Sequence, residues 1–188
     1  MGAPPRSTDD PDDPDEAVGD DGPADATGPH WVDIDGHRWR ATDPSIPSSF
    51  RQELFDELLR SRQAIALLKA TGDQALVEHN RRQTHAAKVA LGERGEPWWE
   101  PPTPQGRRAR VEAAILALVG HRAPRSSICP SDAARAVGGD SWRDLMPVAR
   151  DAARDLALAG DVVVTQGDQV LDPAEEWHGP IRIRLSRR

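Results

Sequence analysis

The stretch SICPSDAARAVGGDSW, residues 127–142, decides how the C-terminal third of this chain folds. Pro130 suits the first position of a helix, where its missing N–H costs nothing, and Asp132 lies in the first turn, where the helix dipole favours an acid. Ala134 and Gly138 are four residues apart, as are the small residue and the turn glycine of many helix-turn-helix motifs. The stretch therefore predicts the first half of such a motif, entered at Cys129.

The flanking segments complete the order of a winged helix-turn-helix. A short apolar helix precedes the motif, and a third helix follows it, with Pro147 allowed only in the first turn or at a kink. A hairpin turning at Gly167 and a strictly alternating strand end the chain. These elements are predicted over residues 110–119, 126–128, 130–138, 141–159, 162–171 and 181–185.

Two family resemblances accompany these patterns. SICPSDAARAVGGDSWRDLMPVAR together with GPIRIRL resembles the bacterial domain of unknown function 3253 over residues 107–187. That resemblance implies a winged-helix-like fold and carries over no catalytic or binding residues. HRWRATDPSIP and ALGERGEPWW resemble, over residues 30–101, a family of small bacterial proteins sometimes labelled biopolymer transporter Tol. The label implies a membrane helix and a periplasmic signal, which this sequence does not show, so only the similarity is kept.

The first 29 residues differ sharply in composition from the rest. They hold nine acidic residues, one arginine and six prolines, whereas the whole chain has a net charge of −7. Such a segment cannot bury enough apolar surface to offset its ordering entropy, and we expect a disordered acidic tail. The tail either solubilises the chain or competes with phosphate for a basic surface. One cysteine, no secretory signal and no membrane-length apolar run favour a cytoplasmic protein.

Residues 30–101 predict a β-hairpin followed by a helical pair. HWVDIDGHRWR turns at Asp35-Gly36, which places Val32 opposite Trp39 and Arg40 beside Trp31, in reach of a cation–π contact. One helix is expected over residues 49–70, with Ser49 in a capping box and Leu59 and Leu67 widening its apolar stripe. A second helix follows from a cap at residue 73 to residue 91, and its polar centre, residues 78–85, is expected to be exposed.

The predicted fold class is mainly α with small β. It consists of a disordered acidic tail (residues 1–29), a module of β-hairpin and α-helical hairpin (30–101), a Pro-rich linker (102–106) and a winged-helix domain (107–187).

Candidate binding residues follow from charge and aromatic content. Outward-facing arginines on the third helix and the last strand form a candidate nucleic-acid surface, although Asp144, Asp151 and Asp155 interleave with them and weaken the field. Trp98 and Trp99 are a candidate interaction platform, or else they cover the helical pair. The candidate nucleic-acid-binding residues are Arg143, Arg150, Arg154, Arg182 and Arg184.

Cys129 is the only candidate for thiol chemistry. It stands before a helix N-terminus, with Arg122 and Arg125 nearby in sequence, which would suit a redox-responsive thiol. The alternative is a small half-buried residue at the entry to a helix.

These patterns favour a binding protein over an enzyme. Phosphate-binding glycine loops, dinucleotide fingerprints and metal-ligand spacings are missing, so we expect no catalytic residues, cofactor, metal or small-molecule substrate. The sequence predicts a small, non-enzymatic, cytoplasmic binding protein whose winged helix mediates protein interaction or assembly. A DNA-binding regulator is the alternative, and a thiol-based redox sensor is a remote one. Protein and DNA both stay open as partners, and no membrane is expected.

Overall fold

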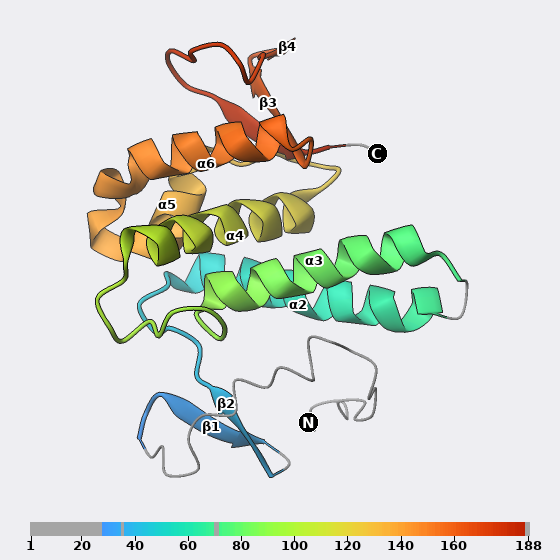
Figure 1. Ribbon diagram of the computed structural model, residues 1–188, viewed down its shortest axis with the longest axis vertical. Helices are drawn as coiled ribbons and strands as arrows, with labels where there is room; N and C mark the ends of the chain where they lie inside the picture. Colours follow the sequence, from blue (N-terminus) through green and yellow to red (C-terminus); the bar gives the residue numbers. More distant parts are fainter. Residues whose placement is uncertain (1–27, 35, 70–71, 187–188) are drawn as a thin grey trace.

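The computed structural model describes residues 28–34, 36–69 and 72–186. Nearly all of the predicted acidic tail therefore lies outside the described residues. The described chain is mainly helical with two small sheets, as predicted. Figure 1 shows the order of the layers: the N-terminal hairpin, the pair α2 and α3, then α4 with α5, and finally α6 with the C-terminal strands.

The N-terminal hairpin has the predicted register. Strand β1 (Trp31–Ile34) pairs antiparallel with β2 (His37–Arg40), and Val32 lies opposite Trp39. Gly36 has a φ of 81°, the left-handed conformation that a tight hairpin turn requires. Arg40 lies opposite Trp31, as predicted. The guanidinium of Arg40 lies over Trp99, 5.6 Å from the ring centroid, because Trp99 packs against the hairpin from outside.

The helical pair consists of α2 (Ser48–Lys69) and α3 (Gln74–Leu91). Helix α3 begins and ends as predicted: the Asp73 carboxylate accepts the Leu76 N–H at 3.1 Å, and Gly92 ends the helix with a φ of 80°. The capping box at Ser49 is wrong. The Pro47 carbonyl accepts the Arg51 N–H at 3.0 Å, so α2 starts one residue earlier and Ser49 lies inside it.

Two faces of this pair differ from the prediction. Leu59 and Leu67 are 53% and 74% exposed, so they do not widen the core stripe of α2. The polar centre of α3 is exposed only in part, at Glu78, Arg82 and His85, because α3 packs against both α2 and α4. Because α3 lies between these two helices, its polar residues Asn80, Gln83 and Thr84 are buried in the interior.

Helix α4 (Pro104–Arg122) is longer than the sequence suggests at both ends. Thr103 accepts the Gly106 N–H at 3.0 Å and Pro104 occupies the first turn, so the helix starts inside the predicted linker. It also continues through Gly120, where side chains of the neighbouring helices lie so close that there is no room for a Cβ atom. The Pro-rich segment is thus a helix entry from residue 103 onward.

The C-terminal elements follow the predicted order. Helix α5 (Pro130–Gly138) leads to a 3₁₀ turn, η1 (Gly139–Leu145), and then to α6 (Met146–Leu158). The predicted start of the third helix at residue 141 is five residues early. The ring of Pro147 would clash with the carbonyl of residue 143 in a continuous α-helix, so the α-helix starts where this proline falls in the first turn.

Strands β3 (Val162–Gln166), β4 (Gln169–Val170) and β5 (Arg182–Leu185) form a sheet in the order β4-β3-β5. Ile128 adds an antiparallel bridge to Ile183, which is the brief strand expected near residue 128. Ile181 and Ile183 are buried while Arg182 and Arg184 are exposed, as the alternation predicts. This sheet closes one side of the core formed by α4, α5 and α6.

One hydrophobic core runs through both predicted modules. It joins Leu54 and Leu91 of the helical pair to Leu118 of α4 and Ile183 of β5. Two ion pairs reinforce the junction: Arg110 of α4 with Asp43 at 2.7 Å, and Arg122 with Glu53 of α2 at 2.7 Å. In the part of the chain described here, none of the helices combines the length and apolarity needed to span a membrane.

Candidate functional site

The two central arginines of α6 hold the segment between β4 and β5, residues 171–181, which we call the wing segment. Arg150 donates to the carbonyls of Trp177 at 2.6 Å and Gly179 at 3.0 Å. Arg154 donates to the carbonyl of Pro173 at 2.9 Å and also to that of Glu175. These arginines are therefore half-buried hydrogen-bond donors to the protein's own backbone.

Trp177 anchors the wing segment against α6. Its side chain is 7% exposed, and its Nε1 donates to the Asp172 carbonyl at 2.7 Å. The Arg154 guanidinium lies over its indole, 4.6 Å from the ring centroid. Gln166 of β3 closes the other side by donating to the His178 carbonyl at 2.8 Å. Trp177 is not among the residues predicted from the sequence, although a single large aromatic residue in a connection rich in Pro and Glu is a signal for an anchored segment.

The acidic positions of α6 are exposed beside these arginines. Asp151 and Asp155 both face solvent, and Asp155 forms an ion pair with Arg108 of α4. Helix α6 therefore presents carboxylates outward while two of its arginines turn to backbone carbonyls. In the alternating Arg/Asp pattern of this helix, the aspartates are exposed and the two arginines bind backbone carbonyls.

Arg143 lies at a different place, in the 3₁₀ turn η1 between α5 and α6. Its guanidinium and that of Arg135 each lie over the Trp142 indole, 4.6 and 4.5 Å from the centroid. Both arginines are exposed. Trp142 and Arg135 line a hollow of about 580 Å³, which we call the turn groove. Its walls include Pro47, Phe50 and Val137, which are apolar, and Ser45 and Asp140, which are polar.

The strand arginines lie on yet other surfaces. Arg182 is exposed on β5, opposite Thr165 of β3. Arg184 is also exposed and lines a second hollow together with Arg60 of α2 and His79 of α3. The five predicted nucleic-acid residues thus fall into three settings: η1 for Arg143, the contact with the wing segment for Arg150 and Arg154, and strand β5 for Arg182 and Arg184.

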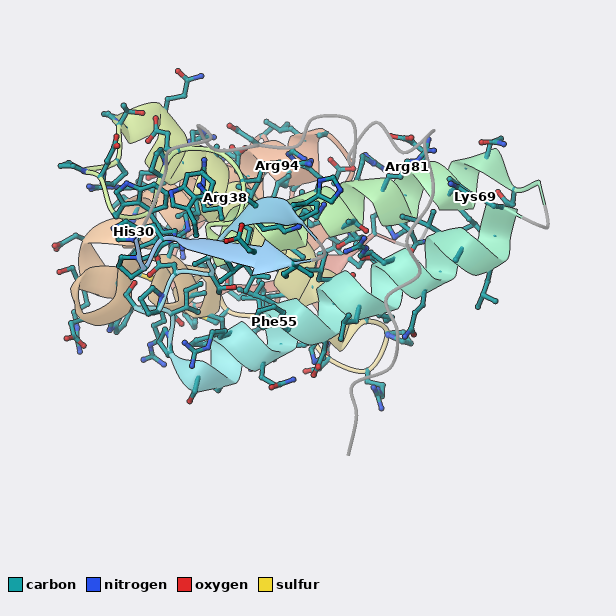
Figure 2. The ribbon with its side chains drawn as sticks, turned by 90° about the horizontal axis from the view of Figure 1, so that it is seen from below. His30, Arg38, Phe55, Lys69, Arg81 and Arg94 are labelled. Carbon is teal, nitrogen blue, oxygen red and sulfur yellow. The ribbon has the colours of Figure 1, made fainter. Side chains whose placement is uncertain are left out.

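Trp98 and Trp99 form an internal aromatic cluster with the hairpin. Trp98 donates its Nε1–H to the Ala41 carbonyl at 2.8 Å, and His30 stacks on Trp99 with ring centroids 4.4 Å apart. Trp31 meets Trp99 edge-on at 5.9 Å. Both indoles are half-buried and tie the hairpin to the helices. Figure 2 shows His30 beside the hairpin, at the opposite end of that view from Lys69 at the end of α2.

Cys129 lies at the entry to α5, half-buried. Its backbone N–H donates to the Asp132 carboxylate at 3.0 Å, which caps the helix from within. Arg122, the neighbouring base, already pairs with Asp132 at 2.9 Å and with Glu53. Its charge is therefore shared between two carboxylates rather than directed at the thiol alone.

A buried polar cluster lies between α2, α3 and α4. The Glu57 side chain is completely buried and accepts two hydrogen bonds from Arg60, at 2.8 and 2.6 Å. Burial raises the pKa of Glu57 above its ordinary value of 4.5, and outweighs the opposing effects of Arg60 and His121. The sequence signal was available: Glu57 and Ser61 continue the stripe of Leu54, Leu58 and Ile65.

The C-terminal part of this fold matches a known protein family. Residues 108–186 match the family model DUF3253, a protein of unknown function. This match confirms the resemblance seen in the SICPSDAARAVGGDSW stretch, and it covers α4 from its second turn through β5. The likeness of residues 30–101 to a second family stays a resemblance. A comparison of the chain with curated proteins found no match.

Proposed function

We propose that this chain is a non-enzymatic, cytoplasmic protein whose winged-helix segment binds another protein. The observation that carries the proposal is the engagement of Arg150 and Arg154. Their guanidiniums donate to carbonyls of the wing segment, while Asp151 and Asp155 face solvent on the same helix. The single cysteine, Cys129, supports the cytoplasmic assignment.

The order of elements supports a winged helix. Helix α4, the bridge at Ile128, helices α5 and α6, and strands β3 and β5 follow one another as in that architecture. The sheet places Ile128 next to β5 and β5 next to β3, and the wing segment connects β4 to β5. Helix α6 takes the position of the recognition helix.

Charge on α6 supports a protein partner over DNA. A DNA-reading helix offers guanidiniums to phosphates and base edges, and affinity grows with the number of phosphates neutralised. Releasing Arg150 and Arg154 for such contacts would leave wing carbonyls without donors. The exposed Asp151 and Asp155 would also repel the phosphate backbone. Protein surfaces tolerate this mixture of charges.

The turn groove supplies the surface for the partner. Its apolar walls, Phe50, Val137 and Trp142, suit a large apolar side chain, while Arg135 and Arg143 beside it favour an acid. We commit to one occupant by charge complementarity: an acidic segment of a partner protein that carries a large apolar residue. Trp and Arg are also the residues in which interface binding energy concentrates.

A peptide-display selection against the full chain tests this proposal. Selected peptides should combine Asp or Glu with a large apolar residue, and Arg135→Glu should weaken their binding about tenfold. Arg125→Glu is the matched control, because Arg125 is also exposed and lies outside the groove. Equal losses in both variants, or selected peptides without acids, would contradict the proposed occupant.

DNA binding is the second candidate, favoured by the exposure of Arg143, Arg182 and Arg184. A native-gel titration of the full chain with duplex DNA at low ionic strength compares the two. We expect affinity no tighter than about 100 μM, the weak end of nonspecific binding. A salt-dependent shift at much lower protein concentration, weakened by Arg143→Gln, would favour the DNA-binding function instead.

A further inference from the structure

The second hollow lies where the helical pair meets the C-terminal sheet. It has a volume of about 310 Å³ and is lined from α2, α3, the connection after α4, and β5. Every ionisable side chain that lines this hollow is basic: Arg60, His79 and Arg184. Ser126 and Ser186 add hydroxyl groups.

The buried carboxylate of Glu57 fixes the orientation of the Arg60 guanidinium. Its Nε donates to Glu57 Oε2 at 2.8 Å and its Nη2 to Glu57 Oε1 at 2.6 Å, and the carboxylate is fully buried. The Arg60 side chain itself is 50% exposed. These two bonds use two of the five N–H donors of the guanidinium, so the remaining donors stay available to a ligand. Because the guanidinium is oriented in advance, binding costs less side-chain entropy.

Arg184 brings a second positive charge to the same hollow. Its side chain forms no ion pair or hydrogen bond with any residue that the structure describes. The neighbouring strand residue of the same kind, Arg182, is exposed as well but does not line the hollow. Two arginines from distant parts of the sequence, residues 60 and 184, thus face one cavity that also carries hydroxyl donors.

We propose that this hollow binds a phosphate-class oxyanion, either free phosphate or the phosphate group of a small molecule. Guanidiniums match the planar edge of such an anion with paired N–H donors, and a charge-assisted bond is about twice as strong as a neutral one. The Glu57 carboxylate lies beneath Arg60 rather than in the lining of the hollow, and both of its printed bonds are accepted from Arg60. The site is independent of the partner proposed for the turn groove.

Isothermal titration of the full chain with inorganic phosphate tests the proposal, with ionic strength held constant by chloride. We expect saturable binding that Arg184→Gln weakens about tenfold. Arg182→Gln is the matched control, since it removes the same charge from the same strand outside the hollow, and it should change the affinity by less than about twofold. Thermal unfolding of both variants checks that the fold is kept.

A comparison of ligands distinguishes free phosphate from a phosphate ester. O-phosphoserine that binds more tightly than inorganic phosphate would assign the site to a phosphate ester, and the reverse order would assign it to the free ion. Lack of saturable binding, equal losses in the two arginine variants, or acetate binding as tightly as phosphate would each overturn the proposal. A failed peptide selection at the turn groove would leave these results unaffected.

Discussion

The guanidinium of Arg154 lies 4.6 Å from the indole centroid of Trp177, and this contact fastens the wing segment to α6. Helix α6 and the wing segment bind each other, through stacking and through hydrogen bonds that Arg150 and Arg154 donate to backbone carbonyls. The surface offered to a partner is therefore set by an internal contact.

Removing this contact should loosen the wing segment without unfolding the core. We expect Arg154→Ala to raise amide hydrogen exchange across residues 172–180 and to cost about 1–2 kcal/mol of stability, because carbonyls lose a charged donor and Trp177 loses its stacking partner. Arg143→Ala is the control, since Arg143 also stacks on a tryptophan but is exposed and lies away from this segment. Unchanged exchange in Arg154→Ala would show that the remaining contacts, from Arg150, Gln166 and the packing of Trp177, are enough to hold the segment.

Gly120 should resist substitution even by alanine. A Cβ added at Gly120 would lie 2.5 Å from Gln83 Oε1 and 2.6 Å from Glu57 Oε1. Alanine inside a helix normally stabilises relative to glycine by about 1 kcal/mol, so crowding should reverse the sign of this substitution. We expect Gly120→Ala to cost about 2 kcal/mol in urea unfolding.

A double-mutant cycle identifies the cause. Gln83→Ala removes one of the two crowding oxygens. Gly120→Ala should therefore cost less stability in the Gln83→Ala background than in the wild type. Additive losses would mean that Gly120 matters for some other reason than contact with Gln83.

The buried Glu57 predicts a definite pH dependence. Its pKa is raised in the folded state, so between the ordinary value of 4.5 and the folded pKa the native protein binds the proton more strongly than the unfolded chain does. The contribution of Glu57 to stability is full below pH 4.5 and is lost as the pH rises through the folded pKa. Glu57→Gln does not titrate there.

Urea unfolding at a series of pH values, in the wild type and in Glu57→Gln, measures this effect. The free energy of unfolding of the wild type should fall relative to the variant as the pH rises above 4.5. Parallel pH profiles would show that Arg60 compensates for the burial of the carboxylate fully.

Arg122 should be a larger contributor than any hairpin ion pair. It joins three helices by donating to Glu53 of α2 at 2.7 Å and to Asp132 of α5 at 2.9 Å, and all three side chains are about four-fifths buried. Arg122→Leu leaves two carboxylates without their partner and should cost about 2–3 kcal/mol in urea unfolding. Arg38→Leu breaks the exposed pair with Asp33 and should cost less than about 1 kcal/mol.

Local chemistry in the sequence determined most of the elements. Asp73 and Gly92 bound α3, Pro130 starts α5, and the hairpin register follows from a turn at Gly36. These signals act over a few residues, through a cap, a fixed φ or a positive φ, so they operate whatever surrounds them. The alternation of Ile181, Ile183 and the strand arginines belongs to the same class.

Tertiary packing decided which side chains are free to bind a partner or ligand. Arg150 and Arg154 have the spacing of a DNA-reading stripe, yet their donors go to carbonyls more than fifteen residues away in sequence. Asn80, Gln83 and Thr84 of α3 are buried because α2 and α4 both cover this helix. Arg184 and Arg60 line the same hollow only because of the fold. Periodicity along one helix states which residues share a face, but whether that face meets water, backbone or another helix depends on partners distant in sequence.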